Sequence, residues 1–214
     1  MSKILNSSQE KYLNSFISTK DTLLKNIEEF AEKNRIPILV PSSANLLEQF
    51  IIMTKPKRVL EIGTAIGYSS IRIARLLGKQ SILHTIEKSS DNILLAKENI
   101  AKASLQNKIK LIEGDALRIM PQMKKKYDFI FLDADKEDYK RLFDYSMLLL
   151  KKDGIIFIDN LLWHGYVAAK NVPKKYKSST KYIKDFNRIF MMQPSLRSII
   201  LPVGDGVGIG VKVI

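Results

Sequence analysis

The fold is decided by residues 58–70, which read Arg58-Val59-Leu60-Glu61-Ile62-Gly63-Thr64-Ala65-Ile66-Gly67-Tyr68-Ser69-Ser70. Apolar residues lead to an acid, a turn with glycines follows, and the apolar-periodic segment 71–77 ends at Gly78. This order is typical of a buried strand, a tight turn and a helix that is closed by a glycine. It predicts the first half of a nucleotide-binding βαβ unit.

Segments typical of strands and helices alternate after Gly78. Further strands are expected at 81–86, 108–113, 127–132 and 154–158, with helices at about 90–101, 136–150 and 180–192. Because the strands are continuous apolar runs, they predict an α/β fold: a doubly wound, mostly parallel, Rossmann-like sheet covered on both faces. Two final runs, 196–203 and 206–213, predict an antiparallel C-terminal hairpin.

The part before this sheet is expected to be helical. Residues 1–54 would form an N-terminal helical cap on a core of residues 55–214, and the two together make a single domain, 1–214. Apolar spacing within 8–34 predicts two helices for packing or dimerisation. Ser42 or Ser43 would cap a third helix that runs to about Met53.

Composition limits the class of protein. With 214 residues, 45% of them hydrophobic, the chain is typical of one globular domain rather than a disordered protein. It has no apolar run long enough for a membrane span, no pattern of a signal peptide and no cysteine, so we expect a cytoplasmic protein without membrane contact. The net charge of +13 favours either solubility alone or a nucleic-acid partner.

Acidic side chains follow five successive predicted strands. They are Glu61, Glu87, Asp115, Asp133 and Asp159, the last followed by Asn160. Ligands of open parallel sheets bind outside the carboxyl ends of the strands. Any one of these acids could simply cap a helix, but five of them at one edge indicate a ligand site.

The turn after Gly63 narrows the choice of nucleotide. A dinucleotide fingerprint would carry glycines where this chain has Ala65 and Tyr68, so close contact with a diphosphate is not favoured. Glu87, 24 residues after Gly63, can accept from ribose hydroxyls, and Asp115 with Ala116 can border an adenine. The pattern favours a nucleoside with a cationic centre, and S-adenosylmethionine fits that description.

Asp133, Asp159 and Asn160 also suggest a metal site. If their strands are neighbours, two carboxylates and one amide oxygen lie together, with His164 the only nearby imidazole. Such oxygen donors select Mg²⁺ or Ca²⁺ rather than zinc. The alternative is that Asp159-Asn160 merely starts a turn.

At these residues the chain resembles the class I S-adenosylmethionine-dependent, cation-dependent O-methyltransferases, the group of catechol and caffeoyl-CoA O-methyltransferases. The motifs are 61–68, Gly114-Asp115-Ala116, Asp133-Ala134-Asp135-Lys136 with Tyr139, and Asp159-Asn160. The resemblance implies a Mg²⁺ site at Asp133, Asp159 and Asn160, a catalytic base at Lys136 beside Asp133, and a homodimer. It also implies a cofactor site at Leu39, Glu61, Gly63, Ser69, Glu87, Asp115, Ala116 and Asp133.

Residues 55–69 and 201–206 are most similar to the branch of that family that methylates 5-hydroxyuridine at the wobble position of tRNA. This implies an anticodon loop as partner, with base or phosphate contacts at Trp163, His164, Lys174, Lys175 and Lys177. Six lysines and no acid occur between Lys170 and Lys184. The alternatives are an enzyme for a small catechol-like or caffeoyl-CoA-like substrate, and a non-catalytic module that binds the cofactor or RNA. The chain departs from the family pattern at Ser42-Ser43-Ala44, where relatives often carry a glycine-containing segment.

Overall fold

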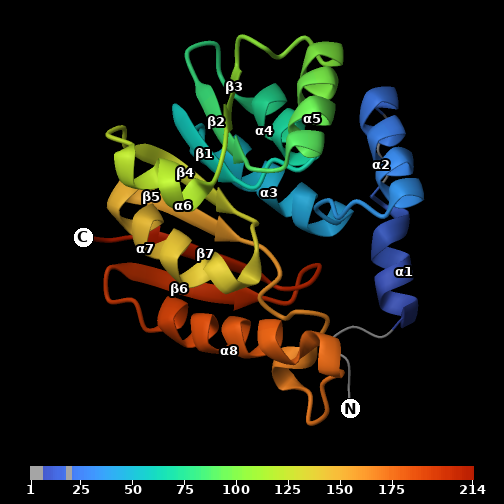
Figure 1. Cartoon of the computed structure of the whole chain (residues 1–214), viewed down its shortest axis with the longest axis vertical. Coiled ribbons are helices and arrows are strands. Elements are labelled where there is room, and N and C mark those ends of the chain that lie inside the picture. Colours follow the sequence, from blue (N-terminus) through green and yellow to red (C-terminus); the bar gives the residue numbers. More distant parts are fainter. Residues whose placement is uncertain (1–6, 18–20) are drawn as a thin grey trace.

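The computed structural model describes residues 7–17 and 21–214, and its centre is a seven-stranded sheet in the order β3-β2-β1-β4-β5-β7-β6 (Figure 1). The strands are β1 (Arg58–Ile62), β2 (Ile82–Glu87), β3 (Ile109–Glu113), β4 (Tyr127–Leu132), β5 (Leu150–Ile158), β6 (Leu196–Leu201) and β7 (Val207–Lys212). The first five are parallel, and β7 is antiparallel to both β5 and β6. The predicted doubly wound sheet and C-terminal hairpin are confirmed.

Helices cover both faces of this sheet. They are α1 (Ser7–Ser15), α2 (Thr22–Asn34), α3 (Pro41–Thr54), α4 (Tyr68–Leu76), α5 (Ser90–Lys102), α6 (Ala116–Ile119), α7 (Tyr139–Leu149) and α8 (Lys177–Met191). Short 3-10 helices lie at η1 (Met120–Gln122), η2 (Lys136–Asp138), η3 (Tyr166–Ala168) and η4 (Lys174–Tyr176). Figure 1 shows α4 and α5 on one side of the sheet and α7 and α8 on the other.

The core has two halves because side chains of a strand alternate between faces. On β4, Phe129 and Phe131 pack in one apolar cluster with residues of α2 to α5, while Ile130 and Leu132 pack in the other with α7 and α8. All four side chains have no exposed surface. Burial on both faces explains why the strands are continuous apolar runs.

Several boundaries differ from the sequence prediction by one to four residues, and two of them, at β5 and α3, have a clear physical reason. Strand β5 begins at Leu150, which pairs with Tyr127, rather than at 154. The polar residues 151–153 hide this extension, and the register shift beside Tyr127 accommodates it. Helix α3 begins at Pro41, because proline is favoured in the first turn of a helix. Ser42 and Ser43 therefore lie inside the helix, and neither caps it.

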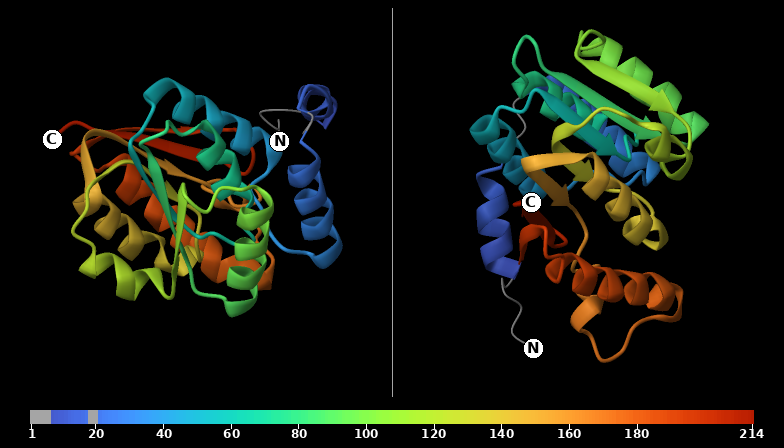
Figure 2. Two further views of the ribbon diagram at one scale, coloured as in Figure 1. Left: turned by 90° about the horizontal axis from the view of Figure 1, so that it is seen from above. Right: turned by 90° about the vertical axis from the view of Figure 1, so that its left-hand side faces the viewer.

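The N-terminal helices lie along one side of the molecule, with α1 at its periphery (Figure 2). Helix α2 buries Leu24, Ile27 and Ala31 against the core. By contrast, Tyr12 on α1 and Phe16 directly after it are 64% and 68% exposed. Among the described residues, no helix has the length and apolar character that crossing a membrane would require.

Candidate active site

A cavity of about 910 Å³ lies at the carboxyl edge of the parallel strands. Its walls come from the ends of β1 to β5, from the segment 37–40 before α3, and from α8. Of the residues predicted from the sequence, those that line it are Leu39, Gly63, Ser69, Glu87, Asp115, Ala116, Asp133, Lys136, Asp159, Asn160, Trp163, His164 and Lys175. The structure therefore brings most of the predicted site into one cavity.

Gly63 holds β1 and β4 close together at the floor of the cavity. Its φ of 99° lies in the region that favours glycine, and a Cβ there would be 1.8 Å from the carbonyl oxygen of Asp133. The Asp133 N–H donates to the carbonyl of Ile62 at 3.0 Å. This approach sets the position of the Asp133 side chain relative to the first turn.

Glu61 does not line the cavity. Its carboxylate is fully buried and accepts hydrogen bonds from the hydroxyls of Ser69 and Ser70 on the first turn of α4. Burial raises the pKa of Glu61 to about 7 despite these two donors. Glu61 therefore acts indirectly, by holding the hydroxyl of Ser69, which does line the cavity.

Glu87 and Asp115 combine a structural role with a position on the wall of the cavity. The Glu87 carboxylate accepts from the backbone N–H groups of Ala65, Lys88 and Ser89, at 2.8, 2.9 and 2.9 Å. Asp115 caps α6 through the N–H of Leu117 at 2.9 Å. The capping alternative thus holds for Asp115, yet both acids also face the cavity.

The ammonium group of Lys136 is held among four acceptors. Its Nζ lies 2.7 Å from Asn160 Oδ1, 2.7 Å from the Tyr139 hydroxyl, 3.0 Å from the carbonyl of Ala134 and 3.1 Å from Asp133 Oδ1. The side chain is only 10% exposed. Residues that follow β4 and β5, together with the first residue of α7, therefore meet at one nitrogen atom.

Asp159 is buried beside this group and accepts from the hydroxyl of Ser43 at 3.3 Å. Burial first, and then the negative charge of Asp133, raise the pKa of Asp159 above its ordinary value. In the described part of the chain, no three His, Cys, Asp or Glu side chains form a metal-binding group. Asp133, Asp159 and Asn160 nonetheless fit a hard divalent cation, because such an ion would offset the repulsion between two carboxylates and accept an amide oxygen.

The far end of the cavity carries aromatic side chains. Trp163 and His164 have ring centroids 5.1 Å apart, and the ring of Tyr176 lies 6.3 Å from Trp163 and 5.1 Å from a stacked Tyr166. The backbone at Trp163, His164 and Gly165 is left-handed, with φ of 47°, 55° and 77°. Such a run of unusual conformations costs free energy and often marks a functional segment.

The three lysines predicted to contact RNA lie in different places in the structure. Lys175 lines the cavity and its Nζ lies 4.6 Å from the centroid of the Tyr176 ring. Lys177 lines a second hollow on another face of α8, and Lys174 lines neither.

Comparisons with known proteins identify the family. The model of the O-methyltransferase family matches residues 14–213. The chain belongs to this family. It is 34% identical over 202 residues to caffeoyl-CoA O-methyltransferase 2 of Petunia hybrida, covering 86% of this chain and 81% of the relative. It is also 33% identical over 204 residues to a caffeoyl-CoA O-methyltransferase of Medicago sativa, covering 87% and 80%.

Solved structures of O-methyltransferases share the fold. A Staphylococcus aureus protein described as a candidate caffeoyl-CoA O-methyltransferase superposes with a TM-score of 0.89 at 34% identity, covering 96% of this chain and all of that one. The O-methyltransferase of Bacillus cereus in complex with SAH gives a TM-score of 0.84 at 25% identity, with 96% and 97% covered. The family resemblance seen in the sequence is confirmed, and the chain is an O-methyltransferase rather than a non-catalytic module.

This O-methyltransferase has two site residues that the sequence analysis did not select. Asp205, between β6 and β7, accepts the N–H of His164 at 2.5 Å, and burial raises its pKa. Ser43 on α3 reaches Asp159. The antiparallel pairing of β7 with β5 brings Asp205 to the ligand edge, and only that pairing could have shown that its turn belongs to the site.

Proposed function

We propose that this O-methyltransferase transfers a methyl group from S-adenosylmethionine to the 5-hydroxyl of 5-hydroxyuridine at the wobble position, 34, of tRNA, giving 5-methoxyuridine. The observation that carries the proposal is an aromatic and cationic rim at the far end of the cavity. Trp163, His164 and Lys175 line the cavity there, and the ring of Tyr176 packs beside Trp163 and Lys175. Aromatic faces stack on unpaired bases, and lysines attract the phosphates of RNA. Both features suit a splayed-out nucleotide.

The methyl donor would occupy the half of the cavity near the first turn. Glu87 and Asp115 there can accept from the ribose and the adenine, and Asp133 offers negative charge to a sulfonium. SAH, present in the structure of the Bacillus cereus relative, is the product that remains when S-adenosylmethionine gives up its methyl group. Leu39, Gly63 and Ser69 supply the remaining contacts.

Asp133, Asp159 and Asn160 would hold a divalent cation, Mg²⁺ by preference for oxygen ligands. When bound, such a cation lowers the pKa of a hydroxyl that coordinates it. The 5-hydroxyl and the neighbouring 4-carbonyl of 5-hydroxyuridine resemble the two oxygens of a catechol, so the nucleoside suits a site of this type.

Lys136 would take the proton of the substrate hydroxyl once its own Nζ has lost a proton, since only the neutral amine has a free electron pair. Its Nζ lies between Asp133 and Asn160, so a base at this atom borders the same oxygen donors as the substrate. Tyr139 orients the lysine, because its hydroxyl accepts from Lys136 Nζ and donates to the carbonyl of Asp159 at 3.1 Å. The oxyanion then attacks the methyl carbon in line with the C–S bond, so that the O–C bond forms as the C–S bond breaks and SAH leaves. The protein contributes chiefly by positioning the two reactants.

A small catechol-like or caffeoyl-CoA-like substrate is the second candidate. It is favoured by the names of the relatives from Petunia hybrida and Medicago sativa, at 34% and 33% identity. Both candidates need the same donor and cation. They differ in the rim, because a small catechol does not require lysines beyond the cavity.

Parallel assays of the two substrate classes test the proposal. Purified protein with S-adenosylmethionine and Mg²⁺ would be given either tRNA that carries 5-hydroxyuridine or small catechols, and the products measured by mass spectrometry. We expect conversion to 5-methoxyuridine, with a KM for tRNA that rises steeply with salt. Methylation of catechols alone, or a KM for tRNA that does not respond to salt, would refute the tRNA substrate.

The homodimer that the sequence analysis expects stays a prediction.

A further inference from the structure

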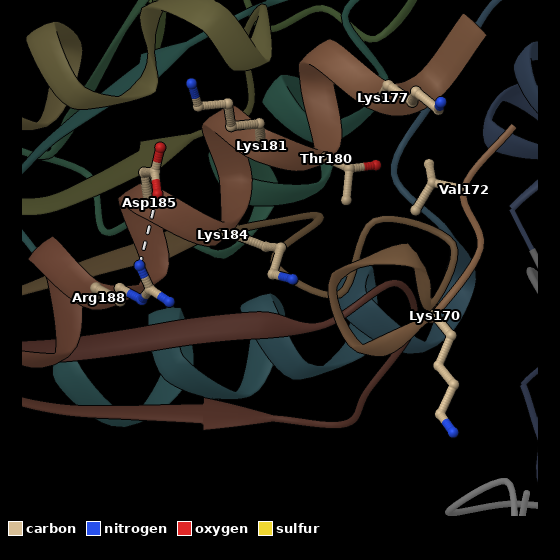
Figure 3. Close-up of a pocket in the computed structure, with 8 residues that line it drawn as sticks. All are labelled: Lys170, Val172, Lys177, Thr180, Lys181, Lys184, Asp185 and Arg188. Atoms are coloured by element: carbon tan, nitrogen blue, oxygen red, sulfur yellow. Dashed lines mark ion pairs between the residues drawn. The ribbon is translucent and has the colours of Figure 1, made fainter. Parts of the chain in front are cut away.

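A second hollow, separate from the catalytic cavity, lies between α8 and the segment before it. It encloses about 380 Å³ (Figure 3). Its lining residues are Lys170, Val172, Lys177, Thr180, Lys181, Lys184, Asp185 and Arg188. Five of these eight side chains are cationic and one is acidic.

The single acid does not neutralise the lysines. Asp185 Oδ1 lies 3.8 Å from Nη1 of Arg188, and Figure 3 shows this pair at one end of the hollow. Within residues 7–17 and 21–214, no carboxylate lies within 4.0 Å of the ammonium groups of Lys170, Lys177, Lys181 or Lys184. Figure 3 shows Lys184 pointing across the hollow, while the other three lysines stand at its border and point in different directions. Four positive charges at and around one hollow favour an anion there.

Thr180 provides a second, independent observation. Its side chain is 4% exposed and lines the hollow, yet its hydroxyl has no hydrogen-bond partner among the residues that the structure describes. Buried hydroxyl groups are nearly always paired, so an unpaired one that borders a cavity is expected to bind a ligand. Figure 3 shows the Thr180 oxygen on the side of Val172 and Lys177.

Helix α8 connects this hollow to the catalytic cavity. Ser178, Ser179 and Tyr182 line the catalytic cavity, whereas Thr180, Lys181 and Lys184 line the hollow. The two sites therefore lie on different faces of one helix. A polymer that places one unit in the cavity and passes over α8 brings a charged group of its backbone to the hollow.

We propose that this hollow is a binding site for a backbone phosphodiester of the RNA strand whose base enters the catalytic cavity. The inference rests on the proposed RNA substrate. A phosphodiester carries one negative charge for the lysines and has oxygens that accept from the Thr180 hydroxyl. Because the hollow lies outside the cavity, it adds to RNA affinity without a part in methyl transfer.

Binding of an anticodon stem-loop RNA to the full-length protein, measured by fluorescence anisotropy over a range of salt concentrations, tests the inference. The double variant Lys181→Ala/Lys184→Ala is expected to bind about tenfold more weakly or worse, with a slope of log K against log salt smaller by about 1.4, since each contact to a single strand contributes about 0.7. Thr180→Val, nearly isosteric, is expected to bind severalfold more weakly with an unchanged slope.

The matched control is Lys79→Ala/Lys124→Ala, which removes the same charge from exposed lysines in loops at the opposite edge of the sheet. If this control weakens binding as much as Lys181→Ala/Lys184→Ala, or if Thr180→Val binds like the wild type, the hollow is not a phosphate site. Methylation of a small catechol, equal in all variants, shows that the enzyme is intact.

The outcomes separate this inference from the proposed function. If wild type and hollow variants methylate 5-hydroxyuridine RNA with the same KM, the inference fails and the function stands. If the wild type binds no RNA, both fail. The hollow variants could instead show a higher KM for a coenzyme A thioester and an unchanged KM for RNA. That result would assign the hollow to the phosphates of the small substrate and overturn the RNA proposal.

Discussion

The ammonium nitrogen of Lys136 lies 2.7 Å from the amide oxygen of Asn160. The two residues are 24 positions apart and follow β4 and β5, which are neighbouring parallel strands. Their contact joins the proposed base to a proposed cation ligand. Changes at either residue are therefore expected to affect the chemical step more than binding of the donor.

Lys136→Ala is expected to lower kcat by about 10²–10⁴-fold, the usual contribution of a general base. Affinity for S-adenosylmethionine should not change, because Lys136 lies at the substrate side. Steady-state kinetics and calorimetry of donor binding measure the two effects. Lys140→Ala is the control, since Lys140 is exposed and, among the residues that the structure describes, forms its ion pair with Asp144 at 3.0 Å. A Lys136→Ala enzyme with normal kcat would exclude the base role.

Asp159→Ala is expected to abolish turnover while donor binding survives, since Asp159 lies on the cation side of the site. Chelation of divalent ions should inactivate the wild type, and Mg²⁺ should restore it. Added Mg²⁺ should also raise the Tm of the wild type but not that of the variant. An equal loss of turnover and donor binding would contradict separate cation and cofactor roles.

Gly63→Ala is expected to destabilise the protein by about 2 kcal/mol or more, because its Cβ would overlap the carbonyl of Asp133 and overpacking is costly. Gly165→Ala is the matched control. Gly165 also has a positive φ, of 77°, but a Cβ there has no neighbour within 4 Å. Only the backbone strain of about 1 kcal/mol is then expected. Chemical denaturation measures both, and equal costs would show that the close approach is unimportant.

Glu61 gives a pH dependence of stability. Its pKa is raised to about 7, so the folded state holds the proton more tightly than the unfolded state. The stability that this provides is complete below about pH 4.5 and is lost as the pH rises through about 7. Glu61→Gln should remove the effect, which reaches about 3 kcal/mol.

Thermal unfolding of wild type and Glu61→Gln at pH 5 and pH 8.5 tests this. The variant should gain stability relative to the wild type at the higher pH. Glu98→Gln, at an exposed position of α5, should show no such gain. A constant difference between wild type and Glu61→Gln across the pH range would mean that Glu61 does not titrate there.

Trp163→Ala is expected to raise KM for the RNA substrate about tenfold, since stacking of a base on an aromatic ring contributes about 1–3 kcal/mol. The effect on small catechols should be weaker, because they lack the neighbouring bases. Trp163 also donates to the hydroxyl of Ser179 at 2.9 Å, so Ser179→Ala serves as the control for loss of that bond alone. Equal KM increases for both substrate classes would refute a role in stacking.

The sequence alone determined the sheet and the edge at which the site lies. Continuous apolar strands imply burial on both faces, and parallel strands end at one edge, so Glu87, Asp115, Asp133 and Asp159 had to lie close together. These are local patterns repeated with a regular period. They need no knowledge of distant contacts.

Only the tertiary structure decided which acids face the cavity and which do not. Glu61 points to Ser69 and Ser70 because the helix after the turn packs directly over β1. Asp205 joins the site because β7 lies antiparallel to β5. Thr180, whose hydroxyl has no partner among the described residues, lines the hollow rather than the cavity because of the face of α8 on which it lies. Such relations depend on strand order and on the rotation of helices about their axes, which a periodic pattern does not specify.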